Sequence, residues 1–329
     1  MIYDDKYLKE SSPNSSTRRA LMREASKSKK DEFYTRYVDI EKEIKTYTDY
    51  DSDVFKDSKV ICPCDDYRVS NFSKFFRDNA ETLGIREVVS TCWPDGLMER
   101  FYYDGTCWVS EVSELEGDGD ILSQEVKYLI DESDFVITNP PFSLFKKIYP
   151  MIKHKKFSLV GNINAVTFKD VYPDIVSGSL STGESIKGGV TYFDVHESYD
   201  ISKATKLLDE DGKTLVGLVS VRWFTNIGHS IRREVNCIPM DENIKTKNKI
   251  SNNPKSYIKY ANSDAINVPD TDAIPSDYSG SMGVPITFLD KYDPDKFDII
   301  AIKKGDNGRD FIFEDGTTPY CRVIIKHKR

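Results

Sequence analysis

Residues 134–145, DFVITNPPFSLF, constrain the fold of this chain more than any other stretch. Residues 135–137 form a short apolar run between polar residues, as expected of a buried strand. Two prolines follow and end the strand, because proline fixes φ and lacks an N–H. Ser143 then offers a helix N-cap, and apolar side chains at helical spacing over residues 145–152 predict an amphipathic helix. Asn139 is therefore expected on a stiff turn at the carboxyl end of a strand, where open α/β sheets bind their ligands.

The turn itself suits the binding of a planar amino group. The Asn139 amide oxygen and the Pro140 carbonyl both accept hydrogen bonds, and neither group ionises. Together they can hold the two N–H bonds of an exocyclic amine such as that of adenine. Rigid acceptors favour a more tetrahedral nitrogen, whose lone pair then points outward. Phe142 can stack on the base.

In this setting the tetrapeptide resembles motif IV of amino-methyltransferases that use S-adenosylmethionine. The resemblance assigns the catalytic role to Asn139, Pro140, Pro141 and Phe142. The alternative is an ordinary strand exit that happens to contain two prolines. The apolar strand before the turn and the helix after it favour the catalytic interpretation.

The opening strand is expected at residues 59–66, KVICPCDD, which end in the carboxylates of Asp65 and Asp66. A helix with a phenylalanine-rich face follows, and this order is typical of the first unit of a doubly wound sheet. Methyltransferases usually carry a glycine-containing loop here, but this turn has no glycine. We expect Asp65 or Asp66 to pair with the amino group of the cofactor, and backbone N–H groups near Ser70 and Asn71 to bind its carboxylate. The alternative is that Asp66 only caps the helix.

Two further segments resemble cofactor-binding motifs of these enzymes. Phe33, Tyr34 and Thr35 precede the first strand at the place of motif X and are expected to line the cofactor site. The alternative is a helix start with packed aromatic side chains. A later Gly-Asp-Gly-Asp loop takes the place of motif III, so Asp118 and Asp120 are expected to meet the adenine of the cofactor. Its alternatives are a glycine-rich turn or an incomplete calcium loop.

The remainder of the chain changes in character. Residues 188–195 and 215–227 alternate in polarity like antiparallel strands that close such a sheet. Residues 177–189 are rich in glycine and serine and predict a mobile loop near the target base. After Gly228 the chain is polar, with short apolar runs and turns such as Asn307-Gly308. We expect a small α+β domain there, suited to reading base edges.

The net charge of −8 argues mildly against a nucleic-acid partner, but the distribution of charge matters more. Residues 18–30 carry six basic side chains and one acid, and residues 243–263 carry five lysines and no acid. Both stretches are candidate phosphate-binding surfaces, and the alternative is that both are solvated loops. The lysines expected to bind DNA are Lys245, Lys247, Lys249, Lys255 and Lys259.

Composition narrows the class of protein. No apolar run approaches the ~20 residues of a bilayer-spanning helix, and the polar start of the chain lacks a signal-peptide core. The six cysteines are scattered and only four histidines are present, so neither a disulfide framework nor a metal site is expected. A reducing, cytoplasmic location without a membrane partner is the simplest interpretation.

Taken together, these segments resemble the EcoRI-type adenine-specific DNA methyltransferase family. The resemblance implies methyl transfer from S-adenosylmethionine to the N6 amine of an adenine flipped out of double-stranded DNA, with a cognate restriction endonuclease as a further partner. It also implies an α/β fold, in which a doubly wound Rossmann-like class I methyltransferase sheet carries a smaller C-terminal α+β DNA-recognition domain. The segments that carry the resemblance are residues 27–41, 62–76, 117–120, 133–145, 262–268 and 283–289.

On this basis we expect a basic N-terminal arm at residues 1–30, a cofactor-dependent catalytic domain at residues 31–230 and a target-recognition domain at residues 231–329. Two other functions stay open. Glutamine methyltransferases of translation factors use a similar turn, because a carboxamide is also a planar amine. The missing glycine loop also fits a catalytically inactive DNA-binding relative. The basic stretches and the long C-terminal region favour DNA as the substrate.

Overall fold

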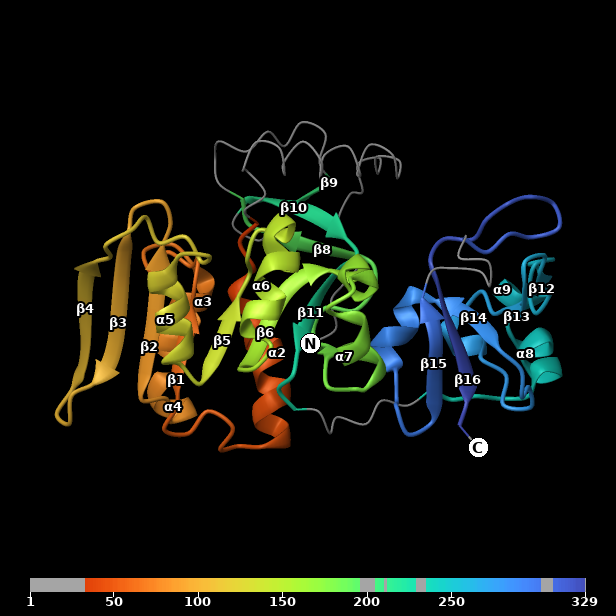
Figure 1. Cartoon of the computed structure of the whole chain (residues 1–329), viewed down its shortest axis with the longest axis horizontal. Coiled ribbons are helices and arrows are strands. Elements are labelled where there is room, and N and C mark those ends of the chain that lie inside the picture. The colour runs from red at the N-terminus through yellow and green to blue at the C-terminus, as the bar shows by residue number, and fades with distance from the viewer. Residues whose placement is uncertain (1–32, 196–204, 210–211, 229–234, 303–309, 329) are drawn as a thin grey trace. The chain divides into compact units, whose positions relative to one another are not determined.

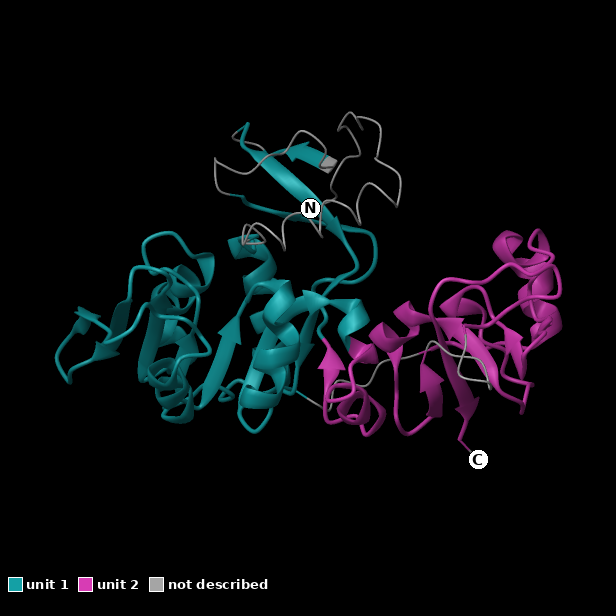
Figure 2. Ribbon diagram, turned by 45° about the horizontal axis from the view of Figure 1, so that its top comes forward, with its two compact units in different colours: residues 1–165, 183–228 teal, residues 166–182, 229–329 magenta. Residues whose placement is uncertain are grey.

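The structure is a computed structural model of the chain and describes residues 33–195, 205–209, 212–228, 235–302 and 310–328. The expected basic arm at residues 1–30 and the Asn307-Gly308 turn lie outside the described residues. The chain divides into two compact units (Figure 2). These units comprise residues 1–165 with 183–228, and residues 166–182 with 229–329.

The first unit is built around a large mixed sheet (Figure 1). Its strands are β1 Lys59–Cys62, β2 Glu87–Cys92, β3 Leu97–Tyr103, β4 Trp108–Glu114, β5 Phe135–Thr138, β6 Lys156–Asn162 and β11 Val221–Thr225. They follow the order β4-β3-β2-β1-β5-β6-β11 across the part of the sheet that belongs to this unit. Strands β2, β1, β5 and β6 run parallel to one another, whereas β3, β4 and β11 join through antiparallel pairs. The protein is thus a mixed α/β fold.

After β1 the chain first adds strands to one side of this strand and later adds strands to its other side. It first forms β2 and the β3-β4 hairpin, and only then β5 and β6. Strands β1 and β5 pair in parallel, with Val60 opposite Phe135 and Ile61 opposite Val136. Their carboxyl ends therefore lie side by side where the order of strands reverses. In open α/β sheets this is the place where ligands bind.

The described helices of this unit include α2 Tyr37–Tyr50, α3 Asn71–Asp78, α4 Ala80–Leu83, α5 Gln124–Asp131, the 3-10 helix η1 Phe142–Leu144 and α6 Phe145–Ile152. The phenylalanine-rich helix expected after β1 forms, but it is divided into α3 and α4. Ser70 caps α3 by accepting a hydrogen bond from the Phe72 N–H at 3.1 Å. Phe72 and Phe76 are buried in the core of the unit, and each such side chain stabilises the fold by about 1.5–3 kcal/mol.

The helix after the central turn begins differently from the expectation. Residues Phe142–Leu144 form the 3-10 turn η1, and α6 starts at Phe145 without a side-chain cap. Ser143 is therefore not its N-cap, and that prediction was wrong. The Pro141 carbonyl instead accepts a hydrogen bond from the Leu144 N–H at 2.8 Å, so the backbone of the turn satisfies its own donor.

The two runs expected to close the sheet separate into different sheets. Strand β8 (Val190–Phe193), β10 (Thr214–Val219) and β9 (Thr205–Leu208) form a three-stranded sheet in the order β8-β10-β9, and only β11 joins the large sheet. The run at residues 215–227 is split at Ser220, whose φ of 64° interrupts the extended chain. Alternation of polarity alone gives no sign of this break.

The glycine- and serine-rich loop at residues 177–189 is held in part by a buried carboxylate. The backbone N–H groups of Glu184 and Ser185 donate to Glu43 on α2 at 3.0 and 2.7 Å, and the Tyr47 hydroxyl donates to it at 2.8 Å. Burial raises the pKa of Glu43, although hydrogen bonds from Ser185 and Tyr47 oppose the shift. Residues 184–185 are therefore anchored, contrary to the expectation of a mobile loop.

The second unit contains a smaller, five-stranded sheet. Its strands are β12 Lys259–Tyr260, β13 Ser263–Asn267, β14 Met282–Pro285, β15 Phe297–Ile302 and β16 Arg322–His327, in the order β12-β13-β14-β16-β15. Tyr260 stacks on Phe311 and lies beside Phe313, with ring centroids 4.6 and 5.2 Å apart. Among the described residues, the remaining elements are η2 Ile163–Thr167, α7 Tyr172–Val176, β7 Ser181–Thr182, α8 Met240–Thr246, α9 Asn248–Ser251, η3 Thr271–Ala273 and η4 Ile286–Lys291. In the described part of the chain, no helix has the length and apolarity needed to cross a bilayer.

Candidate active site

A cavity of about 360 Å³ lies at the carboxyl ends of β1, β2 and β5, which is within the roughly 300–1,000 Å³ of small-molecule sites. The lining residues that the sequence predicts for the cofactor or for catalysis are Phe33, Tyr34, Thr35, Asp65, Asp66, Ser70, Asn71, Asp120, Asn139 and Pro141. The lining residues that it does not predict are Cys64, Val69, Phe72, Trp93, Ile121, Ser143 and Leu144. Pro140, Phe142 and Asp118 are absent from the lining.

The orientation of the Asn139 amide is set by the backbone. Its Nδ2 donates a hydrogen bond to the carbonyl oxygen of Phe33. A carbonyl oxygen can only accept, so it binds the NH₂ end of the amide and not the oxygen end. Oδ1 is therefore the end left for a ligand. Because Asn139 is half-buried and lines the cavity, an acceptor for an amino group is present at the expected place.

Pro140 and Phe142 of the same turn pack against the protein and keep the turn in place. Pro140 is buried. The Phe142 ring is partly buried against the core, with its centroid 6.2 Å from that of Phe33. The Phe142 ring is thus held by packing against Phe33 and the core, although it does not itself line the cavity.

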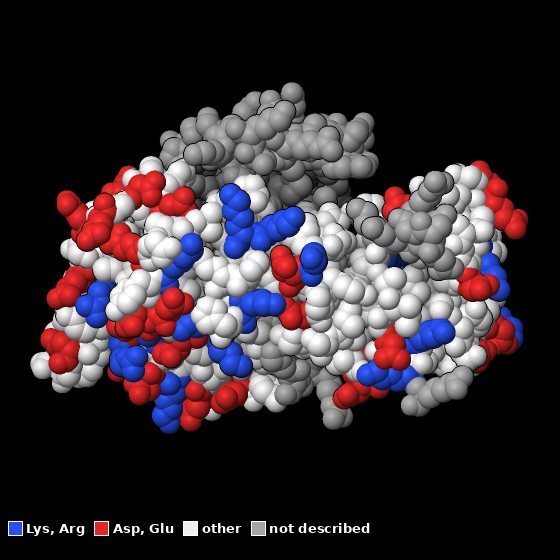
Figure 3. All heavy atoms as spheres, in the orientation of Figure 1, with Lys and Arg blue, Asp and Glu red and all other residues white. Residues whose placement is uncertain are grey.

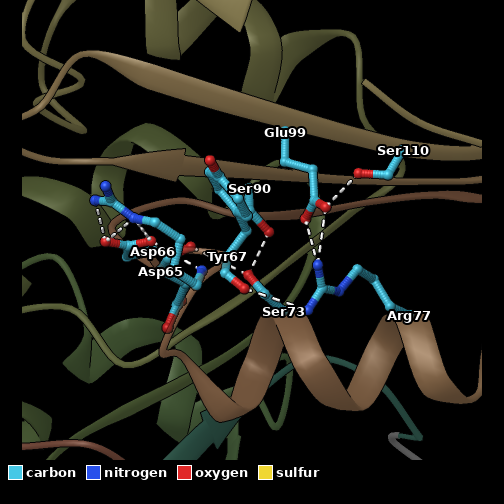
Figure 4. A network of polar contacts seen from close by, with 9 residues as sticks. Asp65, Asp66, Tyr67, Ser73, Arg77, Ser90, Glu99 and Ser110 are labelled. Carbon is cyan, nitrogen blue, oxygen red and sulfur yellow. Dashed lines mark hydrogen bonds and ion pairs between the residues drawn. The ribbon is translucent and has the colours of Figure 1, made fainter. Parts of the chain in front are cut away.

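Asp65 connects the turn after β1 to the end of β5. It is buried, and its Oδ1 accepts a hydrogen bond from the Ser70 hydroxyl at 2.6 Å. Its Oδ2 lies 2.6 Å from the hydroxyl of Thr138, the residue before Asn139. Figure 4 shows a further contact of Asp65, in which the Ser73 hydroxyl lies between the Asp65 backbone carbonyl and Ser90. Asp65 therefore places a carboxylate in the cavity and holds the two turns together.

Asp66 is engaged differently, by an arginine. Arg68 Nε donates to Asp66 Oδ1 at 2.8 Å, and Arg68 also pairs with Asp95 after β2. Burial by itself raises the pKa of Asp66, but the hydrogen bonds and charge of Arg68 outweigh it and the pKa is lowered. Since Ser70 is the N-cap of α3, the alternative that Asp66 caps this helix was wrong.

Replacing Arg68 by Met should return the pKa of Asp66 toward its ordinary value of about 4. A lowered pKa in the folded state adds stability above the unfolded-state pKa, and this stability is lost as the pH falls through the folded-state pKa. The wild type should therefore be slightly more stable than Arg68→Met at pH 7, and the difference should shrink in acid as the Asp66 carboxylate takes up a proton. Urea denaturation at pH 7 and at a series of lower pH values measures it, and a difference independent of pH would contradict the assignment.

The amides at the start of α3 are less available than expected. The Ser70 N–H donates to the Asp66 carbonyl at 2.7 Å, and the Phe72 N–H donates to the Ser70 hydroxyl. The Asn71 side chain is also used, because its Nδ2 donates to the Thr35 carbonyl at 2.9 Å. The backbone N–H of Ser70 thus cannot serve a ligand carboxylate without giving up a bond of the turn, whereas binding by the backbone N–H of Asn71 stays a prediction.

The acidic loop after β4 is an ordered turn beside the cavity. Asp118 accepts hydrogen bonds from the Trp93 indole N–H at 3.2 Å and from the Asp120 backbone N–H at 3.1 Å. Gly119 has a φ of 83°, and a Cβ there would meet the Cys92 carbonyl at 2.7 Å. Asp118 thus acts on the site by holding Trp93, while Asp120 lines the cavity directly. No set of three or more metal-ligating side chains is found in the ranges that the structure describes.

Trp93 and Ile121 give the cavity an apolar wall that the sequence reading missed. Trp93 directly follows β2, and Ile121 directly follows the acidic loop. An apolar residue at the carboxyl end of each segment was the available signal. Hydrogen-bonding groups mark only part of such a site, because a flat base also needs apolar surface.

The five lysines expected to bind DNA lie in the second unit, and each has a partner there. The pairs are Lys245 with Asp241, Lys247 with Asn243, Lys249 with Asp270, Lys255 with Asp315 and Lys259 with Asp264, at 2.9, 2.6, 3.6, 2.8 and 3.1 Å. Aspartates from neighbouring segments thus balance most of the positive charge of residues 243–263, a stretch that contains no acidic residue. These aspartates lower the net positive charge of the surface below what the lysine run alone indicates, although exposed pairs of this kind are weak.

A further pair of lysines lies in the first unit, close to the Asn139 turn in the sequence. Lys146 and Lys147 are exposed on the first turn of α6, directly after the turn that carries Asn139. Neither forms an ion pair within the described ranges of the chain. Figure 3 shows basic side chains over α6. These lysines were not singled out from the sequence, because two lysines on a helix are common and only the fold relates them to the cavity.

Comparison with known proteins agrees with the geometry. The family described as adenine-specific methyltransferase EcoRI matches residues 21–106 and 103–328 of this chain. Type II methyltransferase M.EcoRI of Escherichia coli is 38% identical, over 94% of this chain and 97% of that protein. Type II methyltransferase M.MpnI of Mycoplasma pneumoniae is 31% identical over 93% and 97%, and M.MgeORF184P of Mycoplasma genitalium is 30% identical over 93% and 98%.

No solved structure gives a significant match to the chain. The family match nevertheless covers nearly all of the sequence, including the Asn139 turn and both segments around it. The resemblance drawn from the motifs is thereby confirmed. This chain belongs to the EcoRI family of adenine-specific methyltransferases.

Proposed function

We propose that this chain transfers a methyl group from S-adenosylmethionine to the exocyclic N6 amine of an adenine in double-stranded DNA. The observation that carries the proposal is one cavity in which the Asn139 turn, the turn with Asp65 and residues 33–35 meet. In this proposal the first unit is a doubly wound Rossmann-like methyltransferase domain, and the second unit provides target recognition. DNA is the partner, in a cytoplasmic setting.

The side chains of the cavity fit S-adenosylmethionine. The buried Oγ1 of Thr35 has no hydrogen-bond partner among the described residues, and a polar group of a ligand would satisfy it. Asp65 offers a carboxylate to an ammonium group, while Trp93 and Ile121 offer an apolar wall to a purine. When bound, the cofactor supplies a methyl group on a positively charged sulfur, which is a good leaving group.

The turn after β5 holds and orients the amine that is methylated. Asn139 Oδ1 accepts one N–H bond of the amine and the Pro140 carbonyl accepts the other, which directs the nitrogen lone pair outward. Phe142 stacks on the ring of an adenine extruded from the duplex, at a cost of the order of a few kcal/mol. No covalent enzyme intermediate is needed, so the rate enhancement comes from orientation and from fixed dipoles.

The double variant Lys146→Ala/Lys147→Ala should bind duplex DNA more weakly and with a smaller dependence on salt. Each phosphate contact contributes about −0.9 to the slope of log affinity against log salt concentration, so the slope should fall in magnitude by up to about 1.8. Fluorescence anisotropy with a duplex at several salt concentrations measures it. Lys245→Ala is the matched control, because Lys245 is paired with Asp241 and its loss should change the slope less. Equal slopes in the wild type and the double variant would exclude these phosphate contacts.

The direct test of the proposal is incubation with methyl-labelled S-adenosylmethionine and duplex DNA, followed by analysis of the nucleosides. Label is expected in N6-methyladenine. Label in another base would overturn the assignment of the reaction. Label in cell protein and none in DNA would favour glutamine methylation, and absence of transfer despite calorimetric binding of the cofactor would indicate an inactive relative.

A further inference from the structure

Residues 33–35 form a short extended segment with a different partner along each edge. Along one edge, Tyr34 pairs with Asp194 through two backbone hydrogen bonds of 2.8 and 3.0 Å. In an extended chain, successive residues direct their backbone groups to opposite sides. The carbonyl groups of residues 33 and 35 therefore face away from Asp194, toward another set of donors.

Those donors are the side chains of two asparagines. Asn139 Nδ2 donates to the Phe33 carbonyl, and Asn71 Nδ2 donates to the Thr35 carbonyl at 2.9 Å. Asn71 is the first residue of α3 after β1, whereas Asn139 directly follows β5. One three-residue segment thus connects the two turns that meet at the cavity.

The two asparagines have different roles: Asn139 offers its amide to a ligand, and Asn71 holds the segment that orients this amide. Asn139 lines the cavity with its amide oriented by the Phe33 carbonyl, so its Oδ1 is the end offered to an amine. Asn71 holds the same segment two residues further on. Without Asn71 the Thr35 carbonyl, which belongs to a buried residue, would lack its donor. Since unpaired buried backbone groups are costly, the segment would shift to find another partner, and the Phe33 carbonyl would shift with it.

We infer that Asn71 is a positioning residue for the catalytic amide, and that it acts on Asn139 through the Phe33–Thr35 segment. This inference rests on the proposed function for the role of Asn139. It assigns to the segment at the place of motif X a second task besides lining the cofactor cavity. The segment fixes which end of the Asn139 amide meets the target amine.

The first experiment tests the hydrogen bond to Phe33 through the pH dependence of stability. In Asn139→Asp, only the protonated carboxyl can donate to the Phe33 carbonyl, so the pKa of this carboxyl should be raised in the folded state. A raised pKa gives stability that is present at low pH and lost as the pH rises through it. The deficit in Tm relative to wild type should be small near pH 4 and larger by about 2–4 °C at pH 7.

Asn139→Ala is the control for this experiment, because alanine lacks both the donor and a titrating group. Its deficit in Tm relative to wild type should not change between pH 4 and pH 7. If the Asp and Ala variants show the same dependence on pH, the Asn139 amide is not oriented by the Phe33 carbonyl and the inference is overturned.

The second experiment is a double-mutant cycle between Asn71→Ala and Asn139→Ala. No hydrogen bond joins the two side chains in the described structure, so a departure from additivity would report coupling through the segment. The double variant should lose less Tm than the sum of the two single losses. Asn226→Ala is the matched control, because Asn226 also donates to a backbone carbonyl, that of Lys155 at 2.6 Å. It should be additive with Asn139→Ala, and additivity of Asn71→Ala as well would overturn the inference.

The third experiment measures activity. Asn71→Ala should lower the single-turnover rate of DNA methylation about tenfold at saturating cofactor and DNA, with an unchanged dissociation constant for DNA. An unchanged rate would overturn the positioning role. If the wild type does not methylate DNA at all, the proposed function fails, whereas both stability experiments still decide whether Asn71 and Phe33 orient the amide.

Discussion

Replacement of Asn139 by Ala is expected to lower the rate of methyl transfer to DNA by about 10²–10³-fold or more, which is the usual effect of removing one fixed polar group from a reacting centre. Its Oδ1 is the acceptor that faces the cavity, because the Phe33 carbonyl occupies the Nδ2 end. Single-turnover assays with duplex DNA at saturating S-adenosylmethionine measure the rate.

Cofactor affinity provides the internal control for this variant. Isothermal titration calorimetry should give nearly the same dissociation constant for S-adenosylmethionine in Asn139→Ala and in the wild type. Asn226→Ala, whose side chain also donates to a backbone carbonyl, should retain the wild-type rate. A rate close to that of the wild type in Asn139→Ala would refute the catalytic assignment of the turn.

Replacement of Asp65 by Asn should weaken binding of S-adenosylmethionine by about 10–100-fold. Hydrogen bonds to a charged group contribute roughly 1.5–3 kcal/mol, and 1.4 kcal/mol corresponds to a factor of ten. Asp65 is buried and lines the cavity, with its carboxylate oxygens 2.6 Å from the hydroxyls of Ser70 and Thr138. Its charge is therefore well placed for an ammonium group of a ligand. Calorimetric titration with the cofactor measures the loss.

Asp66→Asn distinguishes the two neighbouring carboxylates. The Asp66 carboxylate is balanced by Arg68, so removal of its charge should change cofactor affinity much less than Asp65→Asn does. Circular dichroism should show the wild-type fold in both variants. A larger loss of affinity in Asp66→Asn than in Asp65→Asn would reverse the assignment.

The sequence predicted the parts of the fold that depend on local patterns. The buried strand before Asn139 and the apolar face of the helix after β1 form as expected. Each of these depends on the order of neighbouring residues, which the sequence states directly. The first strand was expected to reach Asp66 but ends at Cys62, so Asp65 lies in the turn that follows it. Two further expectations failed because neighbouring residues do not specify the backbone there. A 3-10 turn at Phe142–Leu144 precedes α6 in place of a Ser143 cap, and Ser220 has a φ of 64° that divides the expected strand.

Charge shows the limit of such reasoning. The lysine run at residues 243–263 contains no acidic residue, yet its lysines pair with four aspartates in the folded chain. These are Asp241, Asp264, Asp270 and Asp315. Electrostatic interactions depend on distance in space and not on separation in sequence. A basic run therefore predicts a basic surface only after the fold has placed its neighbours.

By itself the sequence determined the family, the turn that carries the reactive amide and most of the residues that meet at the cavity, since each is written in a short contiguous motif. The tertiary structure decided how these motifs act on one another. It brought the segment before the first strand against Asn139, separated the roles of Asp65 and Asp66, and placed Trp93 and Ile121 in the wall of the cavity. These relations join residues that lie far apart in the chain, and only the packing of the sheet and its connections brings them within contact distance.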